Sequence, residues 1–246
     1  MNFERTLRVI IGIVAVAAVG IGGFAFTRTG PAATQARAEY NPVIRPADFV
    51  ERVDNRHFPL APGTTFVSRG TKNGETDTMV VTNETRTVMG VKTTVVWDRT
   101  VNKNNELVED TYDWYAQDKN GDVWYFGEDS KVYKHGKVAS TAGSWEAGKN
   151  GALPGIIMKK HLRVGESWRQ EYSEGVAEDM AQVLGTAETV TVPAGTYRNC
   201  IKTKDWDSLK PYAIENKYYC PGAGIALETP AVGLGGRTEL ISIQHK

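Results

Sequence analysis

Hydrophobic and polar residues alternate, or form short apolar runs, along most of the chain after residue 63. A period of two places successive side chains on opposite faces of a strand, and short apolar runs between turn residues are typical of buried strands. No apolar stripe at helical spacing has a useful length in this region. The pattern predicts strands at Thr64–Arg69, Thr76–Thr82, Thr85–Met89, Val91–Thr100, Leu107–Gln117, Val123–Gly127, Ser167–Tyr172, Ala181–Leu184, Glu188–Val192, Arg198–Lys204, Glu215–Cys220, Ile225–Glu228 and Thr238–Gln244.

Turn residues separate these strands at regular intervals. The tripeptide Lys-Asn-Gly occurs at Lys72–Gly74, Lys119–Gly121 and Lys149–Gly151, and Gly90 and Gly136 mark two further turns. Asn-Gly suits a tight hairpin turn because both residues tolerate positive φ. Short strands joined by such turns predict an all-β protein, with a sandwich as one architecture and a barrel as the other. We expect an antiparallel meander that forms a curved half-barrel or a barrel.

Residues 1–26 predict a hydrophobic helix that serves as a signal peptide or a membrane anchor. Arg5 and Arg8 precede the apolar run Val9–Phe26, which is close to the roughly 20 residues that span a bilayer. Positive charge before an apolar segment keeps the start of the chain in the cytoplasm and sends the rest across the membrane. Cleavage after Ala36-Arg37-Ala38 would release the body, whereas an uncleaved run would anchor it. Both alternatives place the body outside the cytoplasm.

Residues 27–62 predict a linker and entry segment, and residues 63–246 predict a single β domain. Five prolines in the first of these ranges block regular helix and interior strand. They are Pro31, Pro42, Pro46, Pro59 and Pro62.

The charge balance argues against a nucleic-acid partner. The chain has 29 Lys and Arg residues against 29 Asp and Glu residues, with no run of basic residues. A nucleic-acid binder needs a concentrated basic face. The 246 residues can also bury a sizeable core without depending on disulfides.

The segment Glu109–Tyr133 combines aromatic residues and carboxylates in one predicted hairpin. A two-residue loop at its Asn-Gly turn would pair Asp113 with Glu128 and Tyr115 with Phe126. The aromatic pair would stack, but the two acids would repel each other. Such an acid pair requires a metal, an arginine or a shared proton.

A different loop length would remove this repulsion. A three-residue loop with a bulge places Tyr112 opposite Glu128 and is the favoured alternative. The length of the loop therefore decides which side chains share a face.

The segment Gly143–Trp168 predicts a long covering loop. It shows little strand or helix signal, yet it contains the apolar run Ile156–Met158. Loops of this length are uncommon in compact domains and often act as lids. One alternative is a lid in which Trp145 and Ile157 face a ligand. The other is a plug at one end of the barrel, with the apolar run in the core.

The sequence offers no catalytic or metal-binding signature. His57, His135, His161 and His245 lack the spacing of metal ligands, and no G-x-S-x-G motif occurs. Adjacent acids on a strand point to opposite faces, so they do not form an acid/base couple. We expect no metal and no cofactor.

The two cysteines predict a disulfide. Cys200 and Cys220 are equally far from Lys210, inside the predicted turn Ser208–Pro211. A hairpin about that turn would place the two cysteines opposite each other. In an exported protein such a pair is most simply a disulfide.

Two stretches resemble known exported bacterial proteins. VTVPAGTYRNCIKTKD and ENKYYCPGAGIALE resemble the C-terminal half of extracytoplasmic proteins with a lipoprotein-localisation (Lol-type) half-barrel, at Val192–Thr196 and Tyr218–Gly224. The middle, DWYAQDKNGDVWYFGED through GSWEAGKNGALPGIIM, is similar to a family of exported bacterial proteins of uncharacterised function. The two stretches together cover most of Phe58–Glu228. The Lol-type resemblance implies a curved antiparallel sheet that shelters an apolar ligand, and it implies no catalytic residue.

These observations favour an extracytoplasmic, non-enzymatic binding protein for an apolar or aromatic ligand, such as a lipid. An envelope scaffold without a small-molecule site is the alternative, and a carboxylate-dependent hydrolase or lyase is the third hypothesis. Ligand sites are concave and mostly apolar, with few polar groups. The expected ligand-binding residues are Asp113, Trp114, Tyr115, Trp124, Phe126, Glu128, Trp145 and Ile157.

Overall fold

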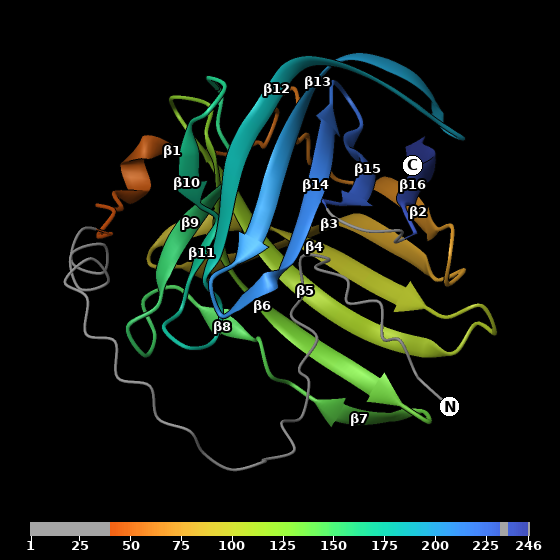
Figure 1. Ribbon diagram of the computed structural model, residues 1–246. Helices are drawn as coiled ribbons and strands as arrows, with labels where there is room; N and C mark the ends of the chain where they lie inside the picture. The colour runs from red at the N-terminus through yellow and green to blue at the C-terminus, as the bar shows by residue number, and fades with distance from the viewer. Residues whose placement is uncertain (1–39, 232–235, 246) are drawn as a thin grey trace, which may run out of the picture.

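The computed structural model describes residues 40–231 and 236–245 as an all-β structure (Figure 1). These residues form sixteen strands and one short 3-10 helix, η1 (Pro46–Asp48). None of their helices is long and apolar enough to cross a membrane. The hydrophobic helix expected in residues 1–26, and the cleavage site near Ala38, lie outside the described residues.

The strands range from two to fourteen residues in length. In chain order they are β1 (Phe49–Val50), β2 (Thr64–Gly70), β3 (Thr76–Val88), β4 (Val91–Val101), β5 (Leu107–Asp118), β6 (Val123–Lys134), β7 (Lys137–Ser140), β8 (Trp145–Glu146), β9 (Leu153–Met158), β10 (Ser167–Arg169), β11 (Glu171–Tyr172), β12 (Asp179–Val192), β13 (Gly195–Asp207), β14 (Lys210–Cys220), β15 (Gly224–Pro230) and β16 (Thr238–His245).

Two meanders make up the sheet. Strands β2 to β6 are neighbours in chain order, and so are β12 to β16. Pairing of β16 with β2 joins the two meanders, and β9 follows β6 at the other side. Figure 1 shows β12–β14 running upright and β4–β6 running diagonally across the molecule. Every strand pair is antiparallel, as the meander prediction requires.

One extended stretch of chain nearly closes the sheet into a barrel. Its first half, β10, pairs with β12, and its second half, β11, pairs with β9. Gln170 lies between them, and its backbone N–H donates to the Asp179 carbonyl at 2.8 Å. The Trp168 indole N–H donates to the Ile156 carbonyl at 2.8 Å. The two ends of the strand order therefore meet, which confirms the antiparallel barrel-like prediction.

A β-bulge explains why the sequence pattern predicts two strands where the structure has one. The expected strands Thr76–Thr82 and Thr85–Met89 belong to one strand, β3, which has a register shift between Val81 and Thr85. A bulge adds residues to one strand without ending the ladder. The alternation of side chains is interrupted there, although the strand continues.

The prediction of a long covering loop at Gly143–Trp168 is wrong. This stretch contains β8 and β9, and both pair with β6. Ile157 is 2% exposed and its neighbour Met158 is fully buried, as the core alternative requires. A Cβ on Gly155 would collide with the Gln170 backbone carbonyl. Glycine is therefore needed for close strand contact here, although in sequence it indicates a break.

The end of the entry segment inserts into the barrel. Phe58 and Leu60 are buried, and Val53 forms a β-bridge with Leu60. The Phe58 ring lies 5.4 Å from the Tyr115 ring of β5 and 6.3 Å from the Tyr219 ring of β14. Because these tyrosines come from the two different meanders, Phe58 fills space between opposite walls.

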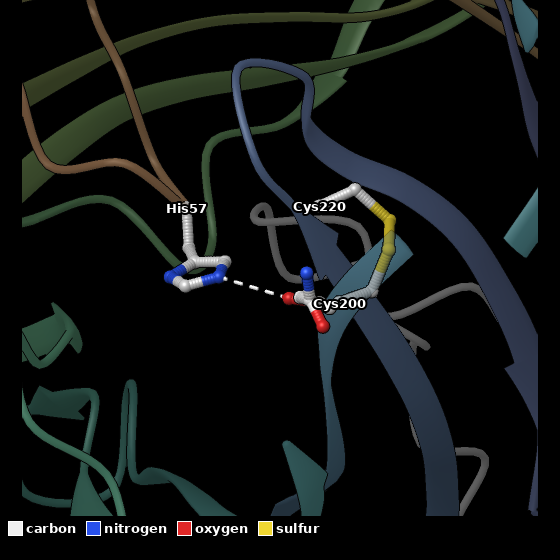
Figure 2. The surroundings of a disulfide bond; sticks show 4 residues. His57, Cys200 and Cys220 are labelled. Carbon is white, nitrogen blue, oxygen red and sulfur yellow. Dashed lines mark hydrogen bonds between the residues drawn. A yellow bond between two sulfur atoms is a disulfide. The ribbon is translucent and has the colours of Figure 1, made fainter. Parts of the chain in front are cut away.

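The disulfide Cys200–Cys220 is present, as predicted (Figure 2). Ile201 pairs with Tyr219, so the cysteines lie at the next opposed position of β13 and β14. The hairpin turn lies at 208–209, just before Lys210, the expected centre of the hairpin. A register shift between Trp206 and Asp207 offsets this difference, so the two cysteines still lie opposite each other. Beside the disulfide, His57 Nε2 lies 3.2 Å from the Asn199 carbonyl oxygen.

Candidate functional site

The hairpin of β5 and β6 combines features of both predicted registers. The Asp118 N–H donates to the Asp122 carbonyl at 2.9 Å, which leaves a three-residue loop at 119–121. Asp113 nevertheless lies opposite Glu128. The acid pair is therefore confirmed, although it was expected only with the shorter loop.

A second irregularity reconciles this loop with this pairing. The register shifts between Asp113 and Tyr115, so Tyr115 pairs with Tyr125 and not with Phe126. Tyr112 lies opposite Asp129, not opposite Glu128. The predicted Tyr115–Phe126 and Tyr112–Glu128 pairs are both wrong, because the bulge adds one residue to β6 after the loop.

Gly127 permits this bulge. Its φ is 128°, a conformation that side chains rarely adopt. A Cβ at this position would collide with the Trp145 carbonyl oxygen and would lie 2.9 Å from the Glu146 Cα. The backbone of β8 therefore occupies the space that a side chain would need.

Three of the expected ligand-binding residues lie on the outer face of the sheet, where β1 and Arg86 pack against them. The Phe49 ring of β1 contacts Trp124 and Phe126, with ring centroids 6.3 and 5.5 Å apart. The Arg86 guanidinium lies 4.0 Å above the Trp114 ring. Trp114, Trp124 and Phe126 thus pack outside the barrel interior.

The other five residues lie on the interior side. Asp113 and Tyr115 alternate with Trp114 along β5, and Glu128 lies opposite Asp113. Trp145 pairs with Glu128, and Ile157 lines a small interior cavity. The structure therefore divides the eight predicted residues between the two faces of the sheet.

Aromatic rings form a continuous column inside the barrel. Tyr115 and Tyr125 stack at 4.7 Å, and Trp145 meets Tyr125 edge-on at 5.4 Å. Phe58 extends the column at the Tyr115 end. Offset and edge-on ring pairs stabilise a core beyond their buried area. These rings therefore fill much of the interior instead of lining an open pocket.

Carboxyl groups are buried beside this column. Asp113 accepts a hydrogen bond of 2.5 Å from the Tyr125 hydroxyl, whereas both Glu128 carboxyl oxygens lack a hydrogen-bond partner. Burial raises the pKa of Asp113 to about 8, although the Tyr125 hydrogen bond lowers it. Burial, with the nearby Glu171 and Asp113, raises the pKa of Glu128 well above its usual range. Burial therefore favours the protonated form of both carboxyl groups.

A second acidic group lies across the interior. Burial and Asp179 raise the pKa of Glu171, while burial and Asp207 raise the pKa of Asp179 to about 7. Lys217 Nζ lies 3.8 Å from Asp205 and partly balances this group. The cavity between these strands is only about 10 Å³, enough for at most one water molecule.

The acidic interior does not form a metal centre in this geometry. Among residues 40–231 and 236–245, no three or more His, Cys, Asp or Glu side chains are arranged to hold a metal ion. The carboxyls are separated along several strands, and burial favours their protonated forms.

An apolar cavity lies between β2, β3, β4, β15 and β16. Its volume is about 50 Å³, and it is lined mainly by apolar surface. The lining residues are Phe58, Phe66, Ser68, Asp77, Met79, Asp98, Ala223, Ile225, Glu228 and Thr238. We call this space the apolar cavity. It matches the mostly apolar, partly polar character of small-molecule sites.

An acid pair forms one wall of the apolar cavity. Asp98 is 7% exposed and lines the cavity together with Asp77. Burial, Asp77 and the further acids Asp113 and Glu109 raise the pKa of Asp98 well above its usual range. The Thr100 hydroxyl donates to Asp77 at 3.0 Å.

A larger groove, of about 440 Å³, lies outside the barrel, between the entry segment and the β3–β4 hairpin. Polar and charged side chains of both signs line most of it, including Glu51, Arg52, Glu84 and Lys92. Its walls are less apolar than those of the apolar cavity, which makes it a weaker candidate for a small-molecule site.

Sequence reasoning missed every residue of the apolar cavity. Phe66 and Met79 occupy inward positions of strands that were predicted correctly. Alternation in Asp77 and Met79 could have shown a shared face. Insertion of Phe58 depends on contacts with residues 57 to 161 positions further along the chain, so no local pattern predicts it.

Comparison with known proteins supplies no relative. No protein-family model, curated protein or solved structure matches the chain.

Proposed function

We propose that this protein is an extracytoplasmic, non-enzymatic binding protein that holds the apolar end of a small ligand in the apolar cavity. The observation that carries this proposal is a cavity whose walls combine Phe58, Phe66, Met79 and Ile225 with a few carboxyl groups. Burial of apolar surface supplies the affinity, and the polar groups orient the ligand. The enclosed volume suits one end of a molecule, with the remainder in the cavity mouth.

Location outside the cytoplasm is part of the proposal. The Cys200–Cys220 disulfide supports it, because such bonds persist in oxidising compartments. Residues 9–26 would anchor the chain, or cleavage near Ala38 would release it. A fusion of alkaline phosphatase after residue 62 tests export. We expect an active fusion, whereas an inactive cytoplasmic fusion would overturn this part.

A titration of the full chain with 1-hexanol, followed by amide chemical shifts, tests binding. We expect shifts at Phe66, Met79 and Ile225. Ala223→Leu fills the cavity wall and should abolish the shifts, because Ala223 is buried and lines the cavity. Ala142→Leu, at an exposed loop position, is the matched control and should bind normally. Equal binding by both variants, or no binding by the natural chain, would contradict the proposal.

An envelope scaffold is the second candidate function. The filled interior favours it, since Phe58, Tyr115, Tyr125 and Trp145 occupy the barrel beside the cavity. A scaffold would show no saturable binding of 1-hexanol. Asp113 and Glu128 line none of the three cavities described above, so the structure offers no support for a hydrolase or lyase at this pair.

A further inference from the structure

All the ionisable side chains that line the apolar cavity are acidic. Three carboxylic acids, Asp77, Asp98 and Glu228, line it, and no Lys, Arg or His is among its ten lining residues. The other lining residues are apolar or carry a hydroxyl group. A ligand that fits these walls meets Asp77 and Asp98 without a basic side chain among the lining residues.

Two of these acids are held together. Met79 of β3 lies opposite Asp98 of β4, and Asp77 lies two residues before Met79 on the same face. Asp77 and Asp98 line the same cavity wall and act on each other electrostatically, and one proton shared between the two carboxyls would leave the pair with one negative charge. The Thr100 hydroxyl is the donor that the structure provides to this pair.

The third acid lies on a different pair of strands. Glu228 of β15 pairs with Thr238 of β16. Lys217 and Glu228 attract each other electrostatically, and Lys217 also lies 3.3 Å from Glu215 and 3.8 Å from Asp205. Because Lys217 is engaged by these three acids, it does not neutralise Asp77 and Asp98.

The negative field of the Asp77–Asp98 pair lies next to further acids on β5. Glu109 and Asp113 on β5 act on Asp98 and have the same sign of charge when ionised. Low-dielectric walls reduce the screening of such a field, so it attracts cations and repels anions.

From this geometry we infer that the ligand of the apolar cavity is an amphiphilic amine, with an alkyl body against Phe66, Met79 and Ile225 and an ammonium group on Asp77 and Asp98. This inference rests on the proposed function and specifies its ligand class. An ammonium has three donors and no acceptor, which matches two carboxyls in one wall. Its positive charge neutralises the single negative charge of the pair. A carboxylate or phosphate head would meet like charge, and a hydroxyl head would leave the charge unbalanced.

The test compares three probes with the same six-carbon chain and different head groups. The full chain is titrated at pH 7 by calorimetry with n-hexylammonium, 1-hexanol and hexanoate. Charge-assisted hydrogen bonds predict that n-hexylammonium binds at least about tenfold more tightly than 1-hexanol. Hexanoate should show no binding.

Substitution of Asp77 or Asp98 tests whether these two acids cause the preference for n-hexylammonium. Asp98→Asn and Asp77→Asn each keep the side-chain shape, and each should reduce the preference for n-hexylammonium over 1-hexanol to about twofold or less. Binding of 1-hexanol should persist in both variants. Asp129→Asn is the control, because it removes one charge from a half-exposed side chain of β6. It should retain the full preference.

The outcomes separate the two proposals. Equal binding of n-hexylammonium and 1-hexanol, or a preference for hexanoate, would overturn the amine assignment and leave the binding function intact. An unchanged preference in both Asp→Asn variants would also overturn the assignment. Absence of binding by all three probes would refute the binding function, and the amine assignment with it. If one variant fails to fold, the amine assignment is still tested by the other variant and by the relative affinities of the three probes for the natural chain.

Discussion

Asp113 and Glu128 lie directly opposite each other on β5 and β6, and each side chain is 2% exposed. Both point into the barrel, where Glu171 of β11 and Asp179 of β12 are close enough to raise the pKa of Glu128. A buried carboxylate without a partner is costly, so these groups hold protons that they would lose in water. Folding and protonation are therefore linked in this protein.

The first prediction is that the protein is more stable at pH 5 than at pH 8.5. Folded Asp113 and Asp179 have pKa values raised to about 8 and about 7, whereas unfolded carboxyls titrate near pH 4. Between about pH 4 and pH 8 the folded state binds more protons than the unfolded state, so the free energy of unfolding falls as pH rises. Glu128 and Glu171 act in the same direction.

Thermal melts across this range check the prediction. Each kcal/mol shifts the melting temperature of a domain of this size by about 2–4 °C. We expect a drop of at least about 5 °C from pH 5 to pH 8.5. The lowered pKa of half-buried His57 opposes the trend, but it is a single group. A melting temperature that rises over this range would contradict the protonated acid cluster.

The second prediction concerns Asp113→Asn. The amide oxygen can still accept the Tyr125 hydrogen bond, and the variant cannot acquire a negative charge. At pH 4 the variant should nearly match the natural chain, because the Asp113 carboxyl is then protonated in the folded state and about half protonated in the unfolded state. At pH 9 it should be more stable by about 1–3 kcal/mol. Urea denaturation at both pH values measures this. Asp129→Asn, on the half-exposed neighbour of Glu128, should show no such pH-dependent gain.

The acid pair shows what the sequence could and could not predict. Alternation and turn residues were sufficient for most of the strands, for the β5–β6 hairpin and for the disulfide, because these follow from patterns within one strand or one hairpin. The side-chain alignment of β5 and β6 depends on the bulge at Gly127, and that bulge depends on the backbone of Trp145. A contact between separate strands leaves no local pattern.

The same reason applies to β9 and to the apolar cavity. Pro154 and Gly155 indicate a break in a strand, but here the glycine allows the Gln170 backbone to approach. Phe58 lies in a proline-rich entry segment, and only the folded barrel shows that it inserts between Tyr115 and Tyr219. Sequence therefore indicated the fold more reliably than the site.

The third prediction concerns the disulfide. Replacing Cys200 and Cys220 together by alanine should lower the free energy of unfolding by roughly 3 kcal/mol, because the bond closes a loop of about twenty residues. Urea denaturation of the double variant and of the natural chain measures the difference. Reduction of the natural chain should cause a similar loss. Two free thiols that titrate in unfolded, unreduced protein would show that the bond does not form.

The fourth prediction is that Ile157 is a core residue and not the tip of a lid. Ile157→Ser removes buried methyl groups and buries an unpaired hydroxyl, which should cost on the order of 2–4 kcal/mol. Ile156, its half-buried neighbour on the other face of β9, should tolerate the same change better. Melting curves of the two variants compare the positions. A negligible loss at Ile157 would restore the lid alternative.

The fifth prediction tests whether Gly127 fixes the register of the hairpin. Gly127→Ala places a methyl group against the Trp145 carbonyl oxygen at a φ of 128°. Strain and collision together should cost on the order of 3 kcal/mol. Gly136→Ala is the matched control, since Gly136 also has positive φ, at 72°, but no heavy atom lies within 4 Å of the point that its Cβ would occupy. It should cost only about 1 kcal/mol.

Amide hydrogen exchange of the same variants distinguishes a local loss from a register slip. If the bulge cannot form in Gly127→Ala, Tyr112 would move opposite Glu128, and the hydrogen bonds between β6 and β8 would lose protection. Gly136→Ala should keep protection at those positions. Equal stability losses in the two variants would show that the approach of β8 does not restrict residue 127. In that case the pairing of Asp113 with Glu128 would need another cause.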